Sequence, residues 1–189
     1  MNELCDFLQN DMNLPKRLIQ DILGFYQEEV LSKNEFLVEK GKRGKRLCFI
    51  TSGYLRFYSS TEKKEITHWI FGKNQLITDV ASFFLQETAK WNIQAMTEVE
   101  VQTLTFENYQ RLRVEVQEWD KHEKLFLIKL LSALENRVYA HLSMTAEERY
   151  QHLFQSDSAM FNELPLHYLA SMLGMTPETL SRIRSKSIS

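Results

Sequence analysis

Residues 166–184 read LHYLASMLGMTPETLSRIR, and their pattern of small, apolar and capping residues is the most informative in the chain. Apolar residues recur three and four positions apart on both sides of Gly174, which predicts two short helices joined by a tight turn. Ala170 is small enough for the helices to approach, and Gly174 ends the first helix in a conformation that glycine adopts without strain. Thr176 is expected to cap the second helix, with Pro177 at its first position. The stretch predicts a helix-turn-helix.

The second helix of this pair would expose a polar and mainly basic face. An arginine such as Arg182 donates two hydrogen bonds to guanine, and a glutamate such as Glu178 accepts one from cytosine. Hydroxyl groups, helix N-termini and terminal cations hold phosphates. The residues expected to contact DNA are Thr176, Glu178, Thr179, Ser181, Arg182, Arg184 and Lys186. The alternative is that Glu178 and Arg182, four positions apart, form a surface ion pair on an ordinary packing helix.

Residues 119–143 form the longest helix that the sequence predicts, and its composition is unusually apolar. Its seam residues step by four, three and four, as in a coiled coil, and other faces carry leucine and isoleucine too. These seam residues are Leu127, Leu131, Leu134 and Val138. A helix that is apolar on several sides must be covered on several sides. We expect it to pack on its own chain and on the same helix of a second subunit; the alternative is a helix buried inside a monomer.

The part of the chain before residue 119 changes its pattern once. Residues 1 to about 32 carry apolar residues at spacings that predict short amphipathic helices. From about residue 35, short β-rich runs alternate with glycines, as in FITSGYLRFY at 49–58. This spacing predicts an antiparallel sheet closed into a roll. The fold class expected for the whole chain is therefore α+β, a β roll of double-stranded β-helix type with flanking helices, followed by helices only.

Composition sets limits on the function. The 189 residues include 23 Lys and Arg against 25 Asp and Glu, so any site for nucleic acid or for a membrane surface must be local. Only two cysteines occur, Cys5 and Cys48, and neither belongs to a spacing that could hold zinc or an iron-sulfur cluster. No stretch is long and apolar enough for a membrane span, and the N-terminal residues MNELCDFLQNDMN lack the basic start and apolar run expected of a signal peptide. We expect a cytoplasmic protein without metal, cofactor or membrane contact.

Together, the glycine-punctuated roll with FITSGYLRFY, the long helix and the C-terminal TPETLSRIR resemble the Crp/Fnr family of bacterial transcription regulators. The resemblance implies an effector domain of cyclic-nucleotide-binding type at 1–118, a dimerisation helix at 119–143 and a winged helix-turn-helix DNA-binding domain at 144–189. It also implies that Glu178 and Arg182 read bases and that Thr176 and Thr179 hold phosphates. The chain departs from many members at Pro177, which stands in place of an arginine. Only AMFNELPLH separates the preceding helix from the helix-turn-helix, and few residues follow the motif, so a reduced wing is expected.

The resemblance also allows a test for a cyclic nucleotide. Nucleotide-binding members use a Gly-Glu pair for the ribose and an Arg-Ser or Arg-Thr pair for the cyclic phosphate. An alignment without gaps places Thr78 and Asp79 on the first pair and Ala89 and Lys90 on the second. The missing arginine argues against cyclic AMP or GMP as the effector. The candidate pocket for another small molecule is lined by Asp79, Ser82, Lys90 and Trp91; the alternative is a roll without a ligand.

Enzyme classes find little support in the sequence. No phosphate-binding loop, dinucleotide fingerprint, zinc protease motif or nucleophile elbow occurs. The roll contributes a single histidine, His68, so a metal-dependent barrel enzyme lacks ligands. We therefore predict a non-enzymatic homodimer that binds double-stranded DNA at an inverted-repeat operator, senses a small molecule through its roll, and contacts RNA polymerase if it activates transcription. The alternative is a ligand-binding or scaffold protein of the same fold that does not bind DNA.

Overall fold

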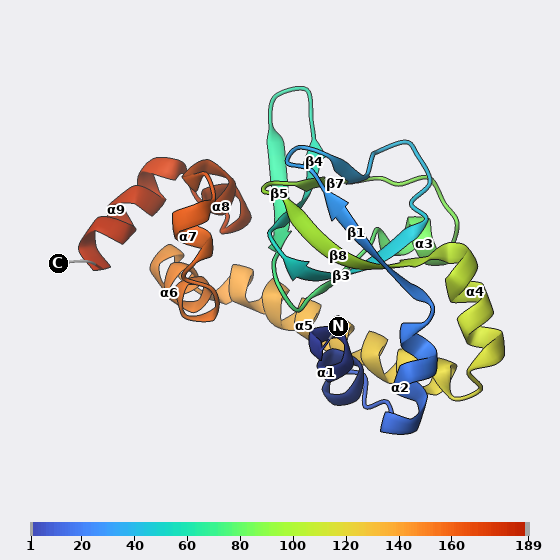
Figure 1. Ribbon diagram of the computed structural model, residues 1–189. Coiled ribbons are helices and arrows are strands. Elements are labelled where there is room, and N and C mark those ends of the chain that lie inside the picture. The colour runs from blue at the N-terminus through green and yellow to red at the C-terminus, as the bar shows by residue number, and fades with distance from the viewer. Residues whose placement is uncertain (1, 188–189) are drawn as a thin grey trace.

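The computed structural model describes residues 2–187, which form a β roll with helices below it and a group of helices beside it (Figure 1). The roll and its N-terminal helices contain α1 (Asn2–Asn10), α2 (Lys16–Leu23), β1 (Tyr26–Leu31), β2 (Phe36–Val38), β3 (Arg46–Ser52), β4 (Leu55–Ser60), β5 (Glu65–Phe71), β6 (Leu76–Ile77), α3 (Val80–Phe84), β7 (Asn92–Ala95) and β8 (Val99–Thr105). The helices that follow are α4 (Phe106–Glu115), α5 (Trp119–Ser143), α6 (Ala146–Ser156), α7 (Met160–Glu163), α8 (Leu166–Met172) and α9 (Pro177–Ser187).

The roll consists of two four-stranded sheets, with strand orders β1-β8-β3-β6 and β2-β7-β4-β5. Every strand pair is antiparallel, which confirms the predicted antiparallel roll. Side chains alternate along β3, as a strand requires. Cys48 and Ile50 belong to the cluster that fills the roll, whereas Leu47 and Phe49 belong to the cluster beneath the helices. One sheet therefore separates two apolar cores.

Strand β1 corrects one expectation, because the sequence predicts helices up to about residue 32. The strand pairs with β8 from Tyr26 opposite Leu104 to Leu31 opposite Val99. Its central residues include Glu28 and Glu29, which are poor strand formers on their own. Burial of Tyr26 and Leu31 at the two ends of the strand, together with its backbone pairing to β8, outweighs the low strand preference of the two glutamates. The first helical segment therefore ends at Leu23, and the rest of the predicted helical stretch is part of the sheet.

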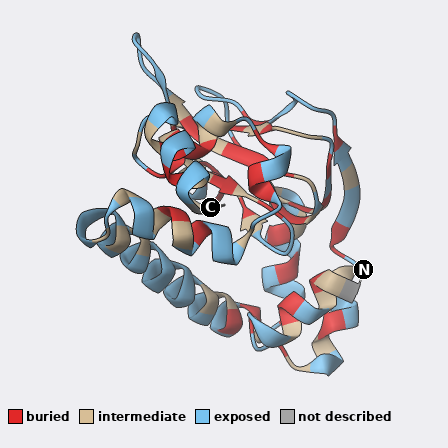
Figure 2. Ribbon diagram, turned by 90° about the vertical axis from the view of Figure 1, so that its left-hand side faces the viewer, coloured by how far each residue is buried: buried red, intermediate tan, exposed pale blue. Residues whose placement is uncertain are grey.

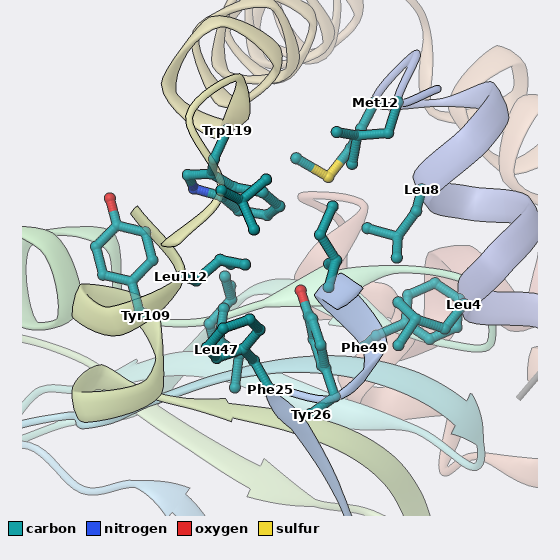
Figure 3. Close-up of a cluster of buried hydrophobic side chains, with 14 of the residues drawn as sticks. Leu4, Leu8, Met12, Phe25, Tyr26, Leu47, Phe49, Tyr109, Leu112 and Trp119 are labelled. Carbon is teal, nitrogen blue, oxygen red and sulfur yellow. The ribbon is translucent and has the colours of Figure 1, made fainter. Parts of the chain in front are cut away.

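The helices beneath the roll cover the outer face of its first sheet. Figure 3 shows side chains from α1, α4, the start of α5 and the strands meeting in one cluster. Trp119, the first residue of α5, is only 2% exposed and lies in this cluster. The neighbouring His122 ring donates a hydrogen bond from Nδ1 to the Met12 carbonyl oxygen at 3.1 Å. The start of the long helix is thus fixed to the roll's own layer of helices.

The C-terminal helices share a third cluster with the roll. Most of its buried members come from α6 to α9, but Tyr54 and Ile70 come from the roll. Helix α8 lies against strand β5, the edge strand of the second sheet (Figure 1). The group of C-terminal helices is therefore packed on the roll of the same chain.

The predicted wing is absent from the described part of the C-terminal segment. Residues 144–187 contain helices and no strand. In the segment where a short wing was expected, residues 160–163 form helix α7. The Met160 N–H donates to Asp157 Oδ1 at 3.1 Å and so holds the start of this helix. A helical turn buries both Met160 and Phe161, and Phe161 packs on Tyr150. Burial of these two side chains explains why this segment is helical.

The described residues also bear on membranes and metals. None of their helices is long and apolar enough to cross a bilayer. Within residues 2–187, no group of three or more His, Cys, Asp or Glu side chains is arranged to hold a metal ion.

Candidate functional site

Helices α8 and α9 are joined by a tight turn with the local geometry that the sequence predicts. Gly174 has a φ of +66°, the left-handed conformation expected for it. The Thr179 N–H donates to Thr176 Oγ1 at 3.2 Å, so Thr176 caps α9. Ala170 and Leu180 are completely buried between the helices. The turn therefore fixes the direction of α9 relative to α8.

Gly174→Ala is expected to lower the free energy of unfolding by about 1 to 2 kcal/mol, because a Cβ in the left-handed conformation approaches the following carbonyl. Space is not the obstacle, since the nearest atom to an added Cβ is His141 Nδ1 at 3.6 Å. Urea denaturation measures the loss. Gly24→Ala is the matched control, because Gly24 has an ordinary helical φ of −62°. Equal losses in both variants would contradict backbone strain as the cause.

The outer side of α9 carries most of the residues expected to contact DNA. Thr176, Glu178, Ser181, Arg182 and Lys186 are exposed, and Thr179 is half-buried. The backbone N–H of Glu178 and the Thr176 hydroxyl hold the pKa of the Glu178 carboxyl below its ordinary value. Glu178 is therefore ionised at neutral pH and can only accept hydrogen bonds. This state suits recognition of an amino group such as cytosine N4.

Arg184 differs from the expected row of DNA-contacting residues. It is half-buried, and its guanidinium donates to the Phe161 carbonyl oxygen and to Asn162 Oδ1, each at 3.3 Å. These contacts attach α9 to α7. The structure thus gives Arg184 a packing position between helices, whereas Arg182 and Lys186 are exposed.

A groove beside α9 adds residues that the sequence interpretation missed. It has a volume of about 300 Å³ and is lined by Thr145, Ala146, Glu147, Thr179, Arg182, Ile183 and Lys186. Its first three residues form the N-terminus of α6, where a capping box joins Thr145 and Glu148. The positive end of this helix therefore lies beside the basic residues of α9. The motif Thr-Ala-Glu-Glu at 145–148 is the sequence signal that could have identified this helix start.

The effector candidates around α3 do not share one environment. Asp79 is 3% exposed; its Oδ1 accepts a hydrogen bond from the Ser82 N–H at 2.9 Å, and its Oδ2 is buried with no hydrogen-bond partner among the described residues. Ser82 is fully buried, and its Oγ accepts from the Gly44 N–H at 2.5 Å. Lys90 is exposed, with Nζ 3.8 Å from Glu87 Oε2. Asp79 and Ser82 thus form the buried base of α3, whereas Lys90 faces solvent.

Trp91 belongs to an aromatic cluster of the roll. The centroid of its ring lies 4.7 Å from that of His68 and 6.1 Å from that of Phe57. Trp69 lies on β5, the same strand as His68, and the guanidinium of Arg137 from α5 lies 4.2 Å from its ring centroid. Burial lowers the pKa of Arg137, and burial, together with the charge of Arg137, lowers the pKa of His68. The sequence interpretation missed Arg137, which links α5 to the roll.

Beyond its start, α5 leaves a long apolar surface uncovered. Figure 2 shows most of this helix as exposed. The four seam residues Leu127, Leu131, Leu134 and Val138 are 40%, 59%, 48% and 51% exposed. A row of exposed apolar side chains along one helix is typical of protein contacts.

Comparison with known proteins places these features in a family context. Residues 28–115 match the sequence profile of the cyclic nucleotide-binding domain. No curated protein matches the chain. Similar solved structures include the c-di-GMP-responsive global regulator CLP from Xanthomonas campestris, with 14% identity, a TM-score of 0.65 and coverage of 91% of both chains.

Two further structures have the same overall fold. FixK2 from Bradyrhizobium japonicum is 16% identical, with a TM-score of 0.67 and coverage of 85% of this chain and 83% of its own. The Catabolite Activator Protein from Thermus thermophilus is 19% identical, with a TM-score of 0.57 and coverage of 94% and 86%. Residues 28–115 are therefore similar to a cyclic nucleotide-binding domain, and the fold of the chain is similar to the folds of CLP, FixK2 and the Catabolite Activator Protein.

Proposed function

We propose that this chain is a non-enzymatic, sequence-specific DNA-binding regulator of transcription that acts as a homodimer. The observation that carries the proposal is the exposed polar face of α9, with Arg182 and Lys186 beside the N-terminus of α6. The tight turn at Gly174 between α8 and α9 supports a helix-turn-helix, in which the second helix would enter the major groove. Basic side chains and helix N-termini on one face suit a phosphate backbone.

Dimerisation through α5 completes this proposal. The uncovered seam of α5 supplies the apolar surface, and a two-fold axis along it would bring two copies of α9 to one side of the dimer. Successive major grooves on one side of DNA lie about 34 Å apart. The operator should accordingly be an inverted repeat. RNA polymerase is a further partner if the dimer activates transcription.

The roll is proposed to bind a small-molecule effector other than a cyclic nucleotide. Ala89, at the position expected for a phosphate contact, is 3% exposed and has no side-chain donor. Lys90 faces solvent next to Glu87. The unpartnered Asp79 Oδ2 supports a ligand that donates a hydrogen bond at the base of α3.

Selection of bound sequences from random duplex DNA tests the proposal, together with calorimetric titration of the protein with cyclic AMP and cyclic GMP. We expect an inverted repeat with half-sites about one helical turn apart, affinity that falls as salt rises, and no heat from either nucleotide. Absence of selected sequences and of salt-dependent DNA affinity would instead identify a ligand-binding or scaffold protein of the same fold.

A further inference from the structure

At the contact between α8 and strand β5, side chains of the helix accept hydrogen bonds from backbone N–H groups at the edge of a sheet. Strand β5 ends the order β2-β7-β4-β5, so one of its edges has no neighbouring strand. On that strand the Thr67 N–H donates to Ser171 Oγ at 3.0 Å, and the Ile70 N–H donates to Met172 Sδ at 3.3 Å. Both acceptors belong to α8. The helix therefore satisfies backbone donors that an edge strand would otherwise leave to water.

A buried arginine reinforces this contact. Arg56 is 3% exposed; its Nε donates to Thr67 Oγ1 at 2.9 Å and its Nη1 to Glu65 Oε2 at 2.6 Å. Its guanidinium lies 4.1 Å from the ring centroid of Tyr58 on the roll and 4.0 Å from that of Tyr168 on α8. A buried cation requires such partners on every side. Arg56 is thus sandwiched between the two rings, and release of α8 would remove the Tyr168 ring from one side of it.

A second contact holds the other end of the C-terminal group. The Tyr54 hydroxyl on the roll donates to the Asp157 carboxylate, with the shorter distance 3.3 Å to Oδ2. The same carboxylate holds the start of α7. Tyr54 and Ile70 also belong to the apolar cluster of α6 to α9. Polar and apolar contacts thus act together at one interface.

We propose that strand β5 is a latch that restrains the α8–α9 pair, so that release of α8 raises affinity for DNA. The proposal rests on the proposed DNA-binding function and adds its regulation. In helix-turn-helix complexes the first helix crosses the DNA backbone. Here that helix is α8, and its Tyr168 and Ser171 are engaged by the roll. While α8 stays on β5, the α8–α9 pair is held in one position on the roll. An inverted-repeat operator, in contrast, requires both copies of α9 in the dimer to reach successive major grooves.

Hydrogen exchange of two backbone amides reports the latch without any DNA. The Thr67 and Ile70 N–H groups are bonded to α8 side chains, so their exchange measures how often α8 leaves β5. In Tyr168→Ala we expect exchange at both amides to become about tenfold faster, and affinity for the operator found by selection to rise about tenfold. Tyr168→Phe is the matched control, because it keeps a ring over Arg56 and should keep both values near those of the unchanged protein.

A second variant guards against a folding defect in α8. Ser171→Ala removes only the hydroxyl that accepts from Thr67, and it should speed exchange of the Ile70 amide, whose acceptor Met172 is unchanged, and raise operator affinity in the same direction. Unchanged exchange in both variants overturns the latch. Faster exchange with unchanged or weaker operator binding overturns restraint as its role. No DNA binding by the unchanged protein or by any variant overturns the regulation and the proposed function together, whereas the other two outcomes leave the function standing.

Discussion

Leu131→Glu is expected to leave the protein monomeric and to weaken operator binding by about 100- to 10,000-fold. Leu131 lies in the middle of the α5 seam and is 59% exposed in the single chain. In a dimer its two copies would meet near the two-fold axis, where paired carboxylates would be both buried and close together. A monomer can bind only one half-site at a time, and it lacks the high effective concentration that a linked second subunit provides at the other half-site. Analytical ultracentrifugation and DNA titration measure the two effects.

Val114→Glu is the control for this change. Val114 lies on α4 and is 81% exposed, so the same substitution there alters charge and apolar surface without touching α5. We expect it to change neither assembly nor DNA binding. A dimer that persists in Leu131→Glu would show that the seam is not the dimer contact.

Arg182→Ala is expected to reduce discrimination between operator and random DNA by about 1 to 3 kcal/mol for each half-site. Arg182 is exposed on α9 and lines the groove beside the start of α6, so its guanidinium can reach a base edge while the helix end faces the backbone. Titrations with operator and with a scrambled duplex of the same length, at several salt concentrations, measure the change.

Lys186→Ala separates base reading from attraction to phosphates. Lys186 lines the same groove near the end of α9, and its loss should weaken binding to both duplexes about equally and lower the salt slope by about one. If Arg182→Ala and Lys186→Ala show equal losses of affinity, and each loss is the same for the operator as for the scrambled duplex, Arg182 is not a base reader.

The sequence predicted best those features that depend on local chemistry. Gly174 adopts its left-handed conformation and Thr176 caps α9 because both effects involve neighbouring residues only. The antiparallel roll was also predictable, since its alternating strands and glycine corners repeat over many residues. The assignment of particular side chains to DNA or to an effector stays a prediction.

Features set by distant partners could not be predicted. Strand β1 resembles a helix until its pairing with β8 is known, and the hydrogen bonds from Arg184 to α7 leave no signal in the sequence. The sandwich around Arg56 joins residues from β4 and α8 that are more than a hundred positions apart. Among the effector candidates, only the fold shows that Asp79 and Ser82 are buried while Lys90 is not.

The position of α8 on β5 also has a consequence for solubility. An uncovered edge strand can recruit a strand of another molecule, and repeated recruitment produces aggregates. The side chains of Ser171 and Met172 occupy the Thr67 and Ile70 donors that such recruitment would use. A chain whose C-terminal helices leave the roll would therefore self-associate unless something else covers that edge. The helices that we propose to read DNA thus also shield the roll from aggregation.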